Sequence, residues 1–442
     1  MRRAAALLAA LAIVAPGAAA ANPMDAFGFG ARGPAMGNAQ TAASTDGGAH
    51  YYNPGILALF REIHIEVGYQ RATPSLSING LDNDVDDSRG MALGVVVPGK
   101  LGKIEVAFGA ASYLPDKQLT RTRTLAGDQP RFSLYDNRPQ RLLLAANVGV
   151  RIGDKLSAGG GVGYMSATTG GVQLQGRIGF PDHLDSELAL AVDVDLKTVR
   201  YPEAGVLYRA LPWLDLGFAY RGGFVLKVDL AFRIDGDIGP SGQVPVIEDA
   251  YVDLLSSFQD LFQPAQFAGG LSARISQDFS LAFDVVLHRW SQYKNPAARI
   301  EIDLDLKDFN DQVNLPPQPD LPDTNFHDIL VPHLGIEWTA ARARHTDWML
   351  RAGYTYEPTP APMQSVSTNF IDSDKHTASL GLGVAVREVT KVLPLPFDVD
   401  VYSAYTWLPE REHRKISPVD RIGDYRAGGS VLQMGVNTRW RF

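Results

Sequence analysis

The chain ends with VLQMGVNTRWRF (431–442), in which apolar residues alternate with polar or small ones. Every second residue of this stretch falls on one face, which carries Leu432, Met434, Val436, Thr438, Trp440 and Phe442. The other face carries Gln433, Gly435, Asn437, Arg439 and Arg441. Because successive side chains of a β-strand point to opposite faces, this spacing of two predicts a strand with one apolar face and one polar face.

The same alternation recurs along the chain, for example at 63–70, 214–221, 281–288 and 397–407. A soluble barrel fills its interior with apolar side chains, whereas a membrane barrel turns them toward lipid and keeps a polar lumen. The pattern therefore predicts an all-β transmembrane barrel, with a secreted β-sandwich as the alternative. The terminal Phe442 also resembles the signal read by bacterial barrel-assembly machinery, which makes that machinery an expected partner.

Segments with this pattern predict about fourteen antiparallel strands, with twelve or sixteen as alternatives. The strands are expected near 61–72, 89–98, 102–113, 140–152, 155–166, 189–209, 213–234, 265–274, 278–290, 330–339, 347–357, 375–387, 397–408 and 430–442. Long outer loops are expected at 114–139, 167–188, 235–264, 291–329 and 409–429. Aromatic residues near strand ends predict interfacial girdles formed by Tyr69, Tyr113, Trp213, Tyr220, Trp290, Tyr354 and Trp407.

Composition narrows the class of protein. The 442 residues contain no Cys, which excludes disulfide scaffolds, thiolate metal sites and cysteine nucleophiles. A net charge of −8 without a long basic tract argues against a nucleic-acid partner. Arg2 and Arg3 precede an apolar run at 4–15, which predicts a secretory signal peptide at 1–21. The mature chain is therefore expected in the bacterial outer membrane, in contact with its lipid and lipopolysaccharide.

Residues 22–60 precede the first expected strand and are rich in Gly and Ala, with Phe27 and Phe29 as apolar contacts. About fourteen strands enclose more space than the wall's own side chains can fill. The segment is therefore predicted to form an N-terminal hatch that plugs the lumen of the barrel formed by 61–442.

The sequence resembles the FadL/TodX family of outer-membrane transporters for long-chain fatty acids and other hydrophobic compounds. The resemblance rests on FGFGARGPAMGNA (27–39), on Asn53-Pro54-Gly55, and on later segments at 202–221, 290–293 and 370–384. It implies a fourteen-stranded barrel, an N-terminal hatch inside it, and ligand passage by movement of the hatch plus a lateral opening in the wall. Gly55 stands where the family motif has Ala, and 167–175 holds no cation that matches the family's charged ligand anchors.

Residues 247–262 have a helical rather than a strand period, because their apolar residues recur at intervals of three and four. This predicts an amphipathic helix in an outer loop, either packed on its own loop or forming an apolar groove for a ligand. The candidate substrate-binding residues are Phe27, Phe29, Tyr251, Leu254, Leu255, Phe258, Leu261 and Phe262. The candidate gating residues of the hatch are Asn53, Pro54 and Gly55.

Three motifs that suggest other chemistry lack their structural context. The GxGxxG at 28–33 has no preceding strand, and Asp82, Asp84 and Asp86 lack the Gly and Glu of a calcium loop. Ser373 and Asp374 are neighbours that point to opposite faces, so they do not form a relay with His376. No catalytic residue, metal or cofactor is therefore expected.

The combined prediction is passive outer-membrane transport of hydrophobic molecules by a monomer, with long-chain fatty acids as the first candidate substrate. Uptake of aromatic hydrocarbons by the same architecture and a non-specific diffusion porin are the alternatives. An outer-membrane lipid hydrolase is a further alternative, which would need Ser and His together near the bilayer rim.

Overall fold

The computed structural model describes residues 23–117, 129–135, 141–179, 187–239, 246–297, 299–312, 320–387, 397–417 and 420–442. The predicted signal peptide (1–21) lies outside the described residues. No helix within the described residues is long and apolar enough to cross a membrane.

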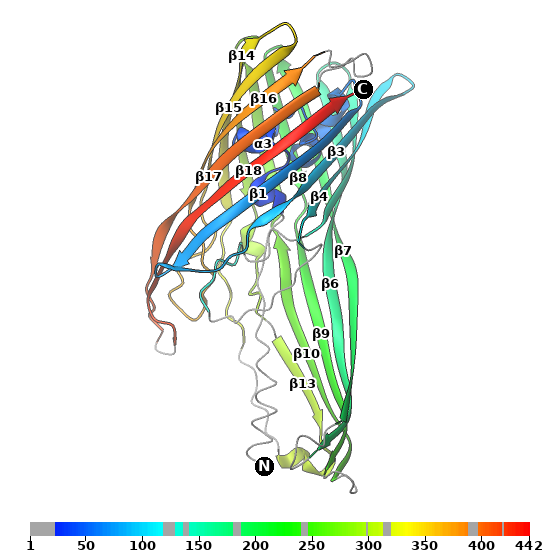
Figure 1. Cartoon of the computed structure of the whole chain (residues 1–442), viewed down its shortest axis with the longest axis vertical. Helices are drawn as coiled ribbons and strands as arrows, with labels where there is room; N and C mark the ends of the chain where they lie inside the picture. The colour runs from blue at the N-terminus through cyan, green and yellow to red at the C-terminus, as the bar shows by residue number, and fades with distance from the viewer. Residues whose placement is uncertain are drawn as a thin grey trace.

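Fourteen antiparallel strands form a closed barrel, as predicted (Figure 1). Pairing of the first strand with the last closes the wall, and a short strand, β2 (Leu81–Asp82), extends the first strand's hairpin. The wall strands are β1 (His64–Ile78), β3 (Ser88–Leu101), β4 (Ile104–Pro115), β5 (Leu143–Ile152), β6 (Leu156–Gly179), β7 (Glu187–Leu211), β8 (Leu214–Arg221), β11 (Gln266–Arg274), β12 (Phe279–His288), β14 (Ile329–Arg342), β15 (Thr346–Glu357), β16 (Lys375–Val386), β17 (Phe397–His413) and β18 (Tyr425–Arg441).

An extension of the sheet projects beyond the barrel at the end where the loops are long (Figure 1). The outer parts of β6 and β7 continue into it and pair with three further strands: β9 (Phe224–Gly239), β10 (Ile247–Gln263) and β13 (Arg299–Asp305). β9 pairs with β6 in parallel, and β10 joins β9 to β13. Two 3-10 turns complete this end, η3 (Trp290–Gln292) and η4 (Lys307–Gln312).

The strand expected at 213–234 is broken at Gly222–Gly223, where the chain leaves the edge of β7. A Cβ on Gly222 would lie 2.6 Å from Pro202 Cδ, and one on Gly223 would lie 2.6 Å from the Ala265 backbone nitrogen, so the break requires residues without side chains. Beyond it, β9 crosses to the free edge of β6, which β5 no longer covers. Parts of the expected loops 167–188, 235–264, 291–329 and 409–429 are therefore strand.

The predicted amphipathic helix over 247–262 is wrong, because these residues form β10. The apolar positions fit both a helical and a strand period, and the intrinsic preference of such a segment for either structure is weak. The ladders to β9 and β13 decide in favour of the strand, since they satisfy its backbone on both edges. A bulge between Gln259 and Leu261 shifts the register and mimics the helical spacing.

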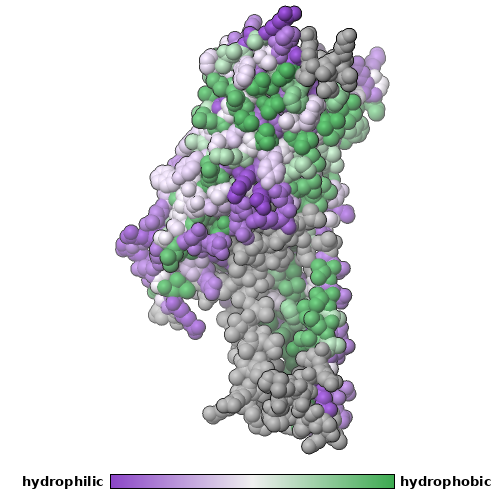
Figure 2. Space-filling model, in the orientation of Figure 1, coloured by the Kyte–Doolittle hydropathy of each residue, from purple (hydrophilic) through white to green (hydrophobic). Residues whose placement is uncertain are grey.

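The barrel wall turns apolar side chains outward, and Figure 2 shows apolar atoms over the barrel and again on the extension. Four of the predicted girdle residues are exposed on this surface, Tyr69, Trp213, Tyr354 and Trp407. Tyr220 is half-buried, whereas Tyr113 and Trp290 are buried, so the assignment of these last two to the girdles is wrong. Tyr113 sits on the inward face of β4, because its place in the alternation matters more than its place near a strand end.

The N-terminal segment, residues 23–60, packs against the inner faces of the wall strands. It consists of α2 (Pro23–Phe27), α3 (Arg32–Ala35), α4 (Ala49–Tyr52) and the 3-10 helix η1 (Pro54–Leu59). η1 contacts β3 to β7, whereas α3 contacts β15 to β17 on another part of the wall. Most of the segment is buried, so it fills the cross-section of the barrel.

Candidate functional site

Buried ion pairs fasten the N-terminal segment to the wall. The Arg32 guanidinium donates to both oxygens of Glu337 on β14, at 3.0 and 3.1 Å, and also to the Ala43 carbonyl. Glu337 also accepts from Arg351 on β15, and Arg351 in turn donates to Asp400 on β17. Fork-shaped guanidinium–carboxylate contacts of this kind fix orientation as well as charge. One arginine of the segment is thus tied to a charge chain that spans several wall strands.

Asn53 is fully buried and uses both ends of its side-chain amide. Its Nδ2 donates to the Thr41 carbonyl at 2.7 Å and to the Val206 carbonyl on β7 at 3.0 Å. Its Oδ1 accepts from the Gly55 backbone nitrogen at 2.9 Å, and this bond caps η1. Asn53 therefore joins two parts of the segment to each other and to the wall.

Gly55 lies so close to the wall that it has no room for a side chain. A Cβ at this position would lie 2.7 Å from the Gly205 carbonyl oxygen and 3.0 Å from Asn53 Oδ1. The backbone of Gly55 is not in the left-handed region, so close approach rather than an unusual turn explains the residue. Opposite it, a Cβ on Gly205 would lie 2.0 Å from Asn53 Oδ1. The departure from Ala in the family motif is thus a steric fit to β7.

His50 of α4 is buried against β3 and β5. Its Nε2 lies 3.1 Å from the Val95 carbonyl, and Asn147 Nδ2 donates to the backbone carbonyl oxygen of His50 at 3.3 Å. Burial lowers the pKa of His50 to about 4, so the ring is neutral at pH 7 and donates through Nε2. This part of the segment is therefore held by uncharged contacts.

A cluster of buried apolar side chains, which we call the apolar chamber, lies on the loop side of the segment, between it and the wall. Phe29 of the segment packs in one buried cluster with Phe258 and Leu261 of β10. The inward faces of β4 to β6 complete the cluster with Ala111, Tyr113, Leu143, Ala145, Met165 and Ala167. The structure thus brings together three of the predicted substrate-binding residues. Phe27 and Phe262 belong to a second buried cluster, which includes Trp290 and Tyr293.

The other three candidates, Tyr251, Leu254 and Leu255, lie out on the extension and not beside the segment. Because they are on a strand, Leu254 shares a face with Phe258, whereas Tyr251 and Leu255 point to the opposite face with Asp253. The predicted single stripe is therefore divided between two faces of the sheet.

The extension has one apolar face, which follows from the register of its strands. Residues paired across the ladders share a face, and the shared positions are Val172 and Leu174 of β6, Leu190, Val192 and Val194 of β7, Leu230, Phe232 and Ile234 of β9, Val252 and Leu254 of β10, and Ile300, Ile302 and Leu304 of β13. The opposite face carries charged groups, among them Arg233, Asp235 and Asp253.

The apolar face leads into the chamber along β9. Its alternate residues Ile234, Phe232 and Leu230 are half-buried, while the next two in the same row, Val228 and Leu226, are buried in the cluster with Phe29. We call these five side chains of β9 the apolar row. It runs without a polar interruption from the outside of the barrel to the N-terminal segment.

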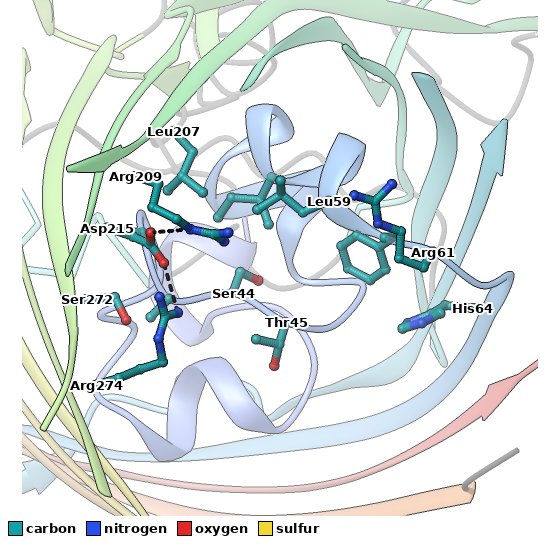
Figure 3. Close-up of a pocket in the computed structure, with 14 residues that line it drawn as sticks. Ser44, Thr45, Leu59, Arg61, His64, Leu207, Arg209, Asp215, Ser272 and Arg274 are labelled. Carbon is teal, nitrogen blue, oxygen red and sulfur yellow. Dashed lines mark hydrogen bonds and ion pairs between the residues drawn. The ribbon is translucent and has the colours of Figure 1, made fainter. Parts of the chain in front are cut away.

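A cavity of about 280 Å³ lies on the other side of the segment, at the end with the short turns (Figure 3). Its lining is mixed: Ala42, Ile56, Leu59, Phe60 and Leu207 form the apolar part, and Ser44, Thr45, His64 and Ser272 belong to the polar part. Arg209 and Arg274 enter from the wall and share the carboxylate of Asp215, whereas Arg61 lies on the opposite side in Figure 3. Two further cavities beside Arg221, on the chamber side, measure about 60 and 20 Å³.

Sequence reasoning did not single out Arg209, Arg221 or Glu337. The alternation could have indicated that they face the lumen, since each occupies a polar position in an alternating strand. Arg221 illustrates what was missed: it donates to Asp25 at 3.0 Å and lies 3.7 Å from the centre of the Tyr51 ring. Which polar positions of the wall meet the segment depends on contacts across the lumen. Among the described residues, no three His, Asp or Glu side chains are grouped to hold a metal ion.

The closed antiparallel wall and the N-terminal segment within it define an outer-membrane barrel with its own N-terminal segment packed against the inside of the wall. The family model described as outer membrane protein transport protein (OMPP1/FadL/TodX) matches residues 8–414, and the chain belongs to this family. It is therefore a bacterial outer-membrane protein that transports hydrophobic compounds and is not an enzyme. No curated protein sequence gives a significant match.

Solved structures share the fold at low sequence identity. A FadL homologue of Pseudomonas aeruginosa aligns with a TM-score of 0.60 at 15% identity, covering 94% of this chain and 98% of that chain. The toluene transporter TodX of Pseudomonas putida aligns with a TM-score of 0.52 at 14% identity, covering 94% and 99%. The toluene transporter TbuX of Ralstonia pickettii aligns with a TM-score of 0.50 at 17% identity, also covering 94% and 99%.

Proposed function

We propose that this protein carries hydrophobic molecules passively from the outer leaflet side to the periplasm, with residues 22–60 acting as a movable hatch. The observation that carries the proposal is the apolar row of β9, which connects an exposed apolar face to a buried chamber lined by Phe29 of the hatch. A hydrophobic molecule gains about 25 cal/mol for each Å² of apolar surface that it removes from water. A continuous row therefore offers a path on which it need not return to water.

Capture begins on the extension, where Leu190, Val192 and Val194 are 57–65% exposed. Exposed apolar patches on otherwise soluble surfaces mark binding or membrane-contact sites. The predicted outer groove keeps its role in this proposal, but a β-sheet face replaces the predicted helix. Phe258, three residues beyond Leu255 on β10, lies where this face enters the chamber.

Passage requires the hatch to move. The cavities beside Arg221, of about 60 and 20 Å³, are much smaller than the roughly 300 Å³ at which ligand pockets begin. The larger cavity shares no lining residue with the cluster around Phe29, so it is separate from the chamber. Asn53, Pro54 and Gly55 join the hatch to β7 between the two, and we assign the gating role to them.

Long-chain fatty acids are the first candidate substrate and aromatic hydrocarbons the second. The family description covers both kinds of relative, and the aligned structures include a FadL homologue and two toluene transporters. The length of the apolar row favours an extended chain, because a flat monoaromatic ring covers few of its residues. The aromatic cluster around Trp290 and Tyr293 is the feature that favours the second candidate.

The test compares hydrophobe uptake with ion conductance. Cells that express the full chain should take up a fluorescent long-chain fatty acid faster than vector controls, while the purified protein in planar bilayers conducts ions poorly. Deleting 24–50 should convert the same protein into an open pore, because it removes most of the hatch. High ion conductance by the full chain would show a diffusion porin instead, and uptake equal to the vector control would refute transport.

A further inference from the structure

A groove of about 440 Å³ lies on the outside of the barrel, where β14, β15 and β16 run side by side (Figure 1). Ala352 on β15 is small, whereas its ladder partners Ile336 on β14 and Leu380 on β16 are large, so a notch forms between them. The outward-facing lining residues are Phe279, Ile336, Trp338, Leu350, Ala352 and Leu380. Arg351 and Gly381, whose side-chain positions face the lumen, complete the lining. The groove therefore faces lipid and is separate from the path through the barrel.

The position of the groove along the strands places it in one leaflet of the membrane. Trp338 at one end of it and Trp348 between it and the turn are 48% and 42% exposed, as interfacial tryptophans are. Ala352 lies six residues beyond Thr346, where β15 begins. On a strand tilted by about 40° this is a depth of roughly 15 Å, or half of the roughly 30 Å hydrocarbon core. Since short turns face the periplasm, the groove spans the acyl chains of the periplasmic leaflet.

Three arginines lie at the periplasmic end of the same strands. Arg342 ends β14, Arg344 lies in the turn to β15, and Arg387 directly follows β16. The backbone nitrogen of Arg387 donates to the His345 carbonyl oxygen at 2.8 Å, which holds the end of β16 against this turn. We call the three arginines the basic turn.

The basic turn has one more positive charge than its local carboxylates neutralise. Arg342 pairs with Asp278, and Arg387 pairs with Asp347. Arg344 is exposed and has no ion-pair partner among the described residues. A cation at the membrane surface attracts anionic head groups, and a guanidinium can bind a phosphate through two parallel hydrogen bonds. Arg344 is therefore available to a lipid phosphate.

We propose that the outer wall of β14, β15 and β16 binds one anionic phospholipid of the periplasmic leaflet, with an acyl chain in the groove and the phosphate on Arg344. Ile336 and Leu380 flank the chain on both sides, and Ala352 leaves the space in which it lies. The groove and the cation are separated by the depth of one leaflet, so a single lipid molecule reaches both. The site lies outside the barrel, so the inference does not depend on the proposed transport function.

The experiment compares two lipids that share their acyl chains and their phosphate. Palmitoyl-oleoyl phosphatidylglycerol is anionic, whereas in palmitoyl-oleoyl phosphatidylcholine the choline cation compensates the phosphate. Each is titrated into the full chain in detergent micelles, and the lipid retained per chain is measured by native mass spectrometry. The wild type should bind one phosphatidylglycerol about fivefold more tightly than phosphatidylcholine, as one surface cation provides. Arg344→Gln should abolish this preference and leave phosphatidylcholine binding unchanged.

Ala352→Phe fills the groove and should weaken the binding of both lipids by a similar factor. Its side chain points toward lipid, so heat-modifiable mobility on gels should show a folded barrel. Two matched controls should bind both lipids as the wild type does: Ala110→Phe makes the same change at an exposed position of β4, and Lys103→Gln removes a cation from another short turn.

Four results would overturn the proposal. Equal affinity of the wild type for the two lipids, or an unchanged preference in Arg344→Gln, would exclude the head-group contact. An effect of Ala352→Phe no larger than that of Ala110→Phe would exclude the groove. Displacement of phosphatidylglycerol by millimolar inorganic phosphate would show an anion site without an acyl chain. Dimers that Ala352→Phe converts to monomers would show that a second copy of the chain occupies the groove.

Discussion

Asn53 Nδ2 donates to the Val206 carbonyl oxygen on β7 at 3.0 Å, and this bond ties the middle of the N-terminal segment to the barrel wall. A β-strand carbonyl normally bonds its neighbour in the ladder, so a side chain that reaches one from the lumen connects the segment without disturbing the wall. The same amide nitrogen also bonds Thr41, so a change at Asn53 affects two contacts at once.

The first prediction concerns this contact. Asn53→Ala removes three hydrogen bonds, two of them buried, each contributing roughly 1 kcal/mol, and leaves the strand ladder intact. We expect heat-modifiable barrel mobility on gels to persist while a small leak conductance develops in planar bilayers. Asn83→Ala, on an outer turn, is the control and should not leak. If Asn53→Ala matches the wild type in both conductance and transport, Asn53 merely ends a turn.

The second prediction tests the close approach of the hatch to β7. Gly205→Ala places a Cβ 2.0 Å from Asn53 Oδ1, so the motif must move away from the wall. The cost of such overpacking is about 1–3 kcal/mol. Leak conductance should rise, and the thermal midpoint of the barrel should fall slightly. Gly269→Ala is the matched control, because its Cβ would meet open space. Identical behaviour of the two variants would contradict the steric explanation of Gly55 and Gly205.

The third prediction separates the two faces of β10. Phe258→Asp puts a carboxylate into the buried chamber, where an unpaired polar group is costly, so uptake of a hydrophobic substrate should fall at least tenfold. Leu255→Asp makes the same chemical change on the polar face of the same strand and should retain uptake. Phe258→Ala, which changes the same position without adding a charge, is the control for misfolding as the cause of the lost uptake. Equal effects of the two Asp variants, measured at equal surface levels, would remove the chamber from the transport path.

The fourth prediction is a pH dependence of the closed hatch. Burial holds the pKa of His50 at about 4, below its ordinary value of 6.5, so protons bind preferentially to states in which His50 is exposed. Above pH 6.5 His50 is neutral in both states, so its burial in the closed state carries no proton-linked cost. As the pH falls from 6.5 to 4, the stability of the closed state relative to the open state decreases by roughly 3 kcal/mol. Leak conductance of the wild type should rise over this range. His50→Gln should flatten the rise, and parallel pH profiles would show that other groups control it.

The strands of the wall could be predicted from the sequence because each of them shows the alternation of apolar and polar residues within its own segment. At 431–442 and at 397–407 one face is apolar over many residues, and a slip of one position would turn that face into the lumen. All fourteen expected wall strands are therefore found, with differences mainly in length. The outer ends were underestimated, because beyond the bilayer the lipid no longer requires apolar side chains on the outward face.

The extension and β10 were misjudged for a different reason. At 247–262 the apolar residues satisfy a helical and an extended period, and no local signal distinguishes them. The choice depends on β9 and β13, which lie elsewhere in the sequence and supply the backbone partners. Gly222 and Gly223 mark the point where β9 leaves the wall, but their role becomes visible once Pro202 and Ala265 are seen against them.

The sequence by itself determined the membrane barrel, a wall of about fourteen strands, the resemblance to the family, and the motif Asn53-Pro54-Gly55, because each of these depends on local alternation or on contiguous residues. The tertiary structure alone decided which charges meet. Arg32 finds Glu337 about 300 residues away, and Arg209, Asp215 and Arg274 converge on one cavity from three strands. The physical reason is that the charged side chains facing the lumen occupy equivalent positions in the alternation of their strands, so their partners are selected by position around the closed wall and not by anything in the neighbouring sequence.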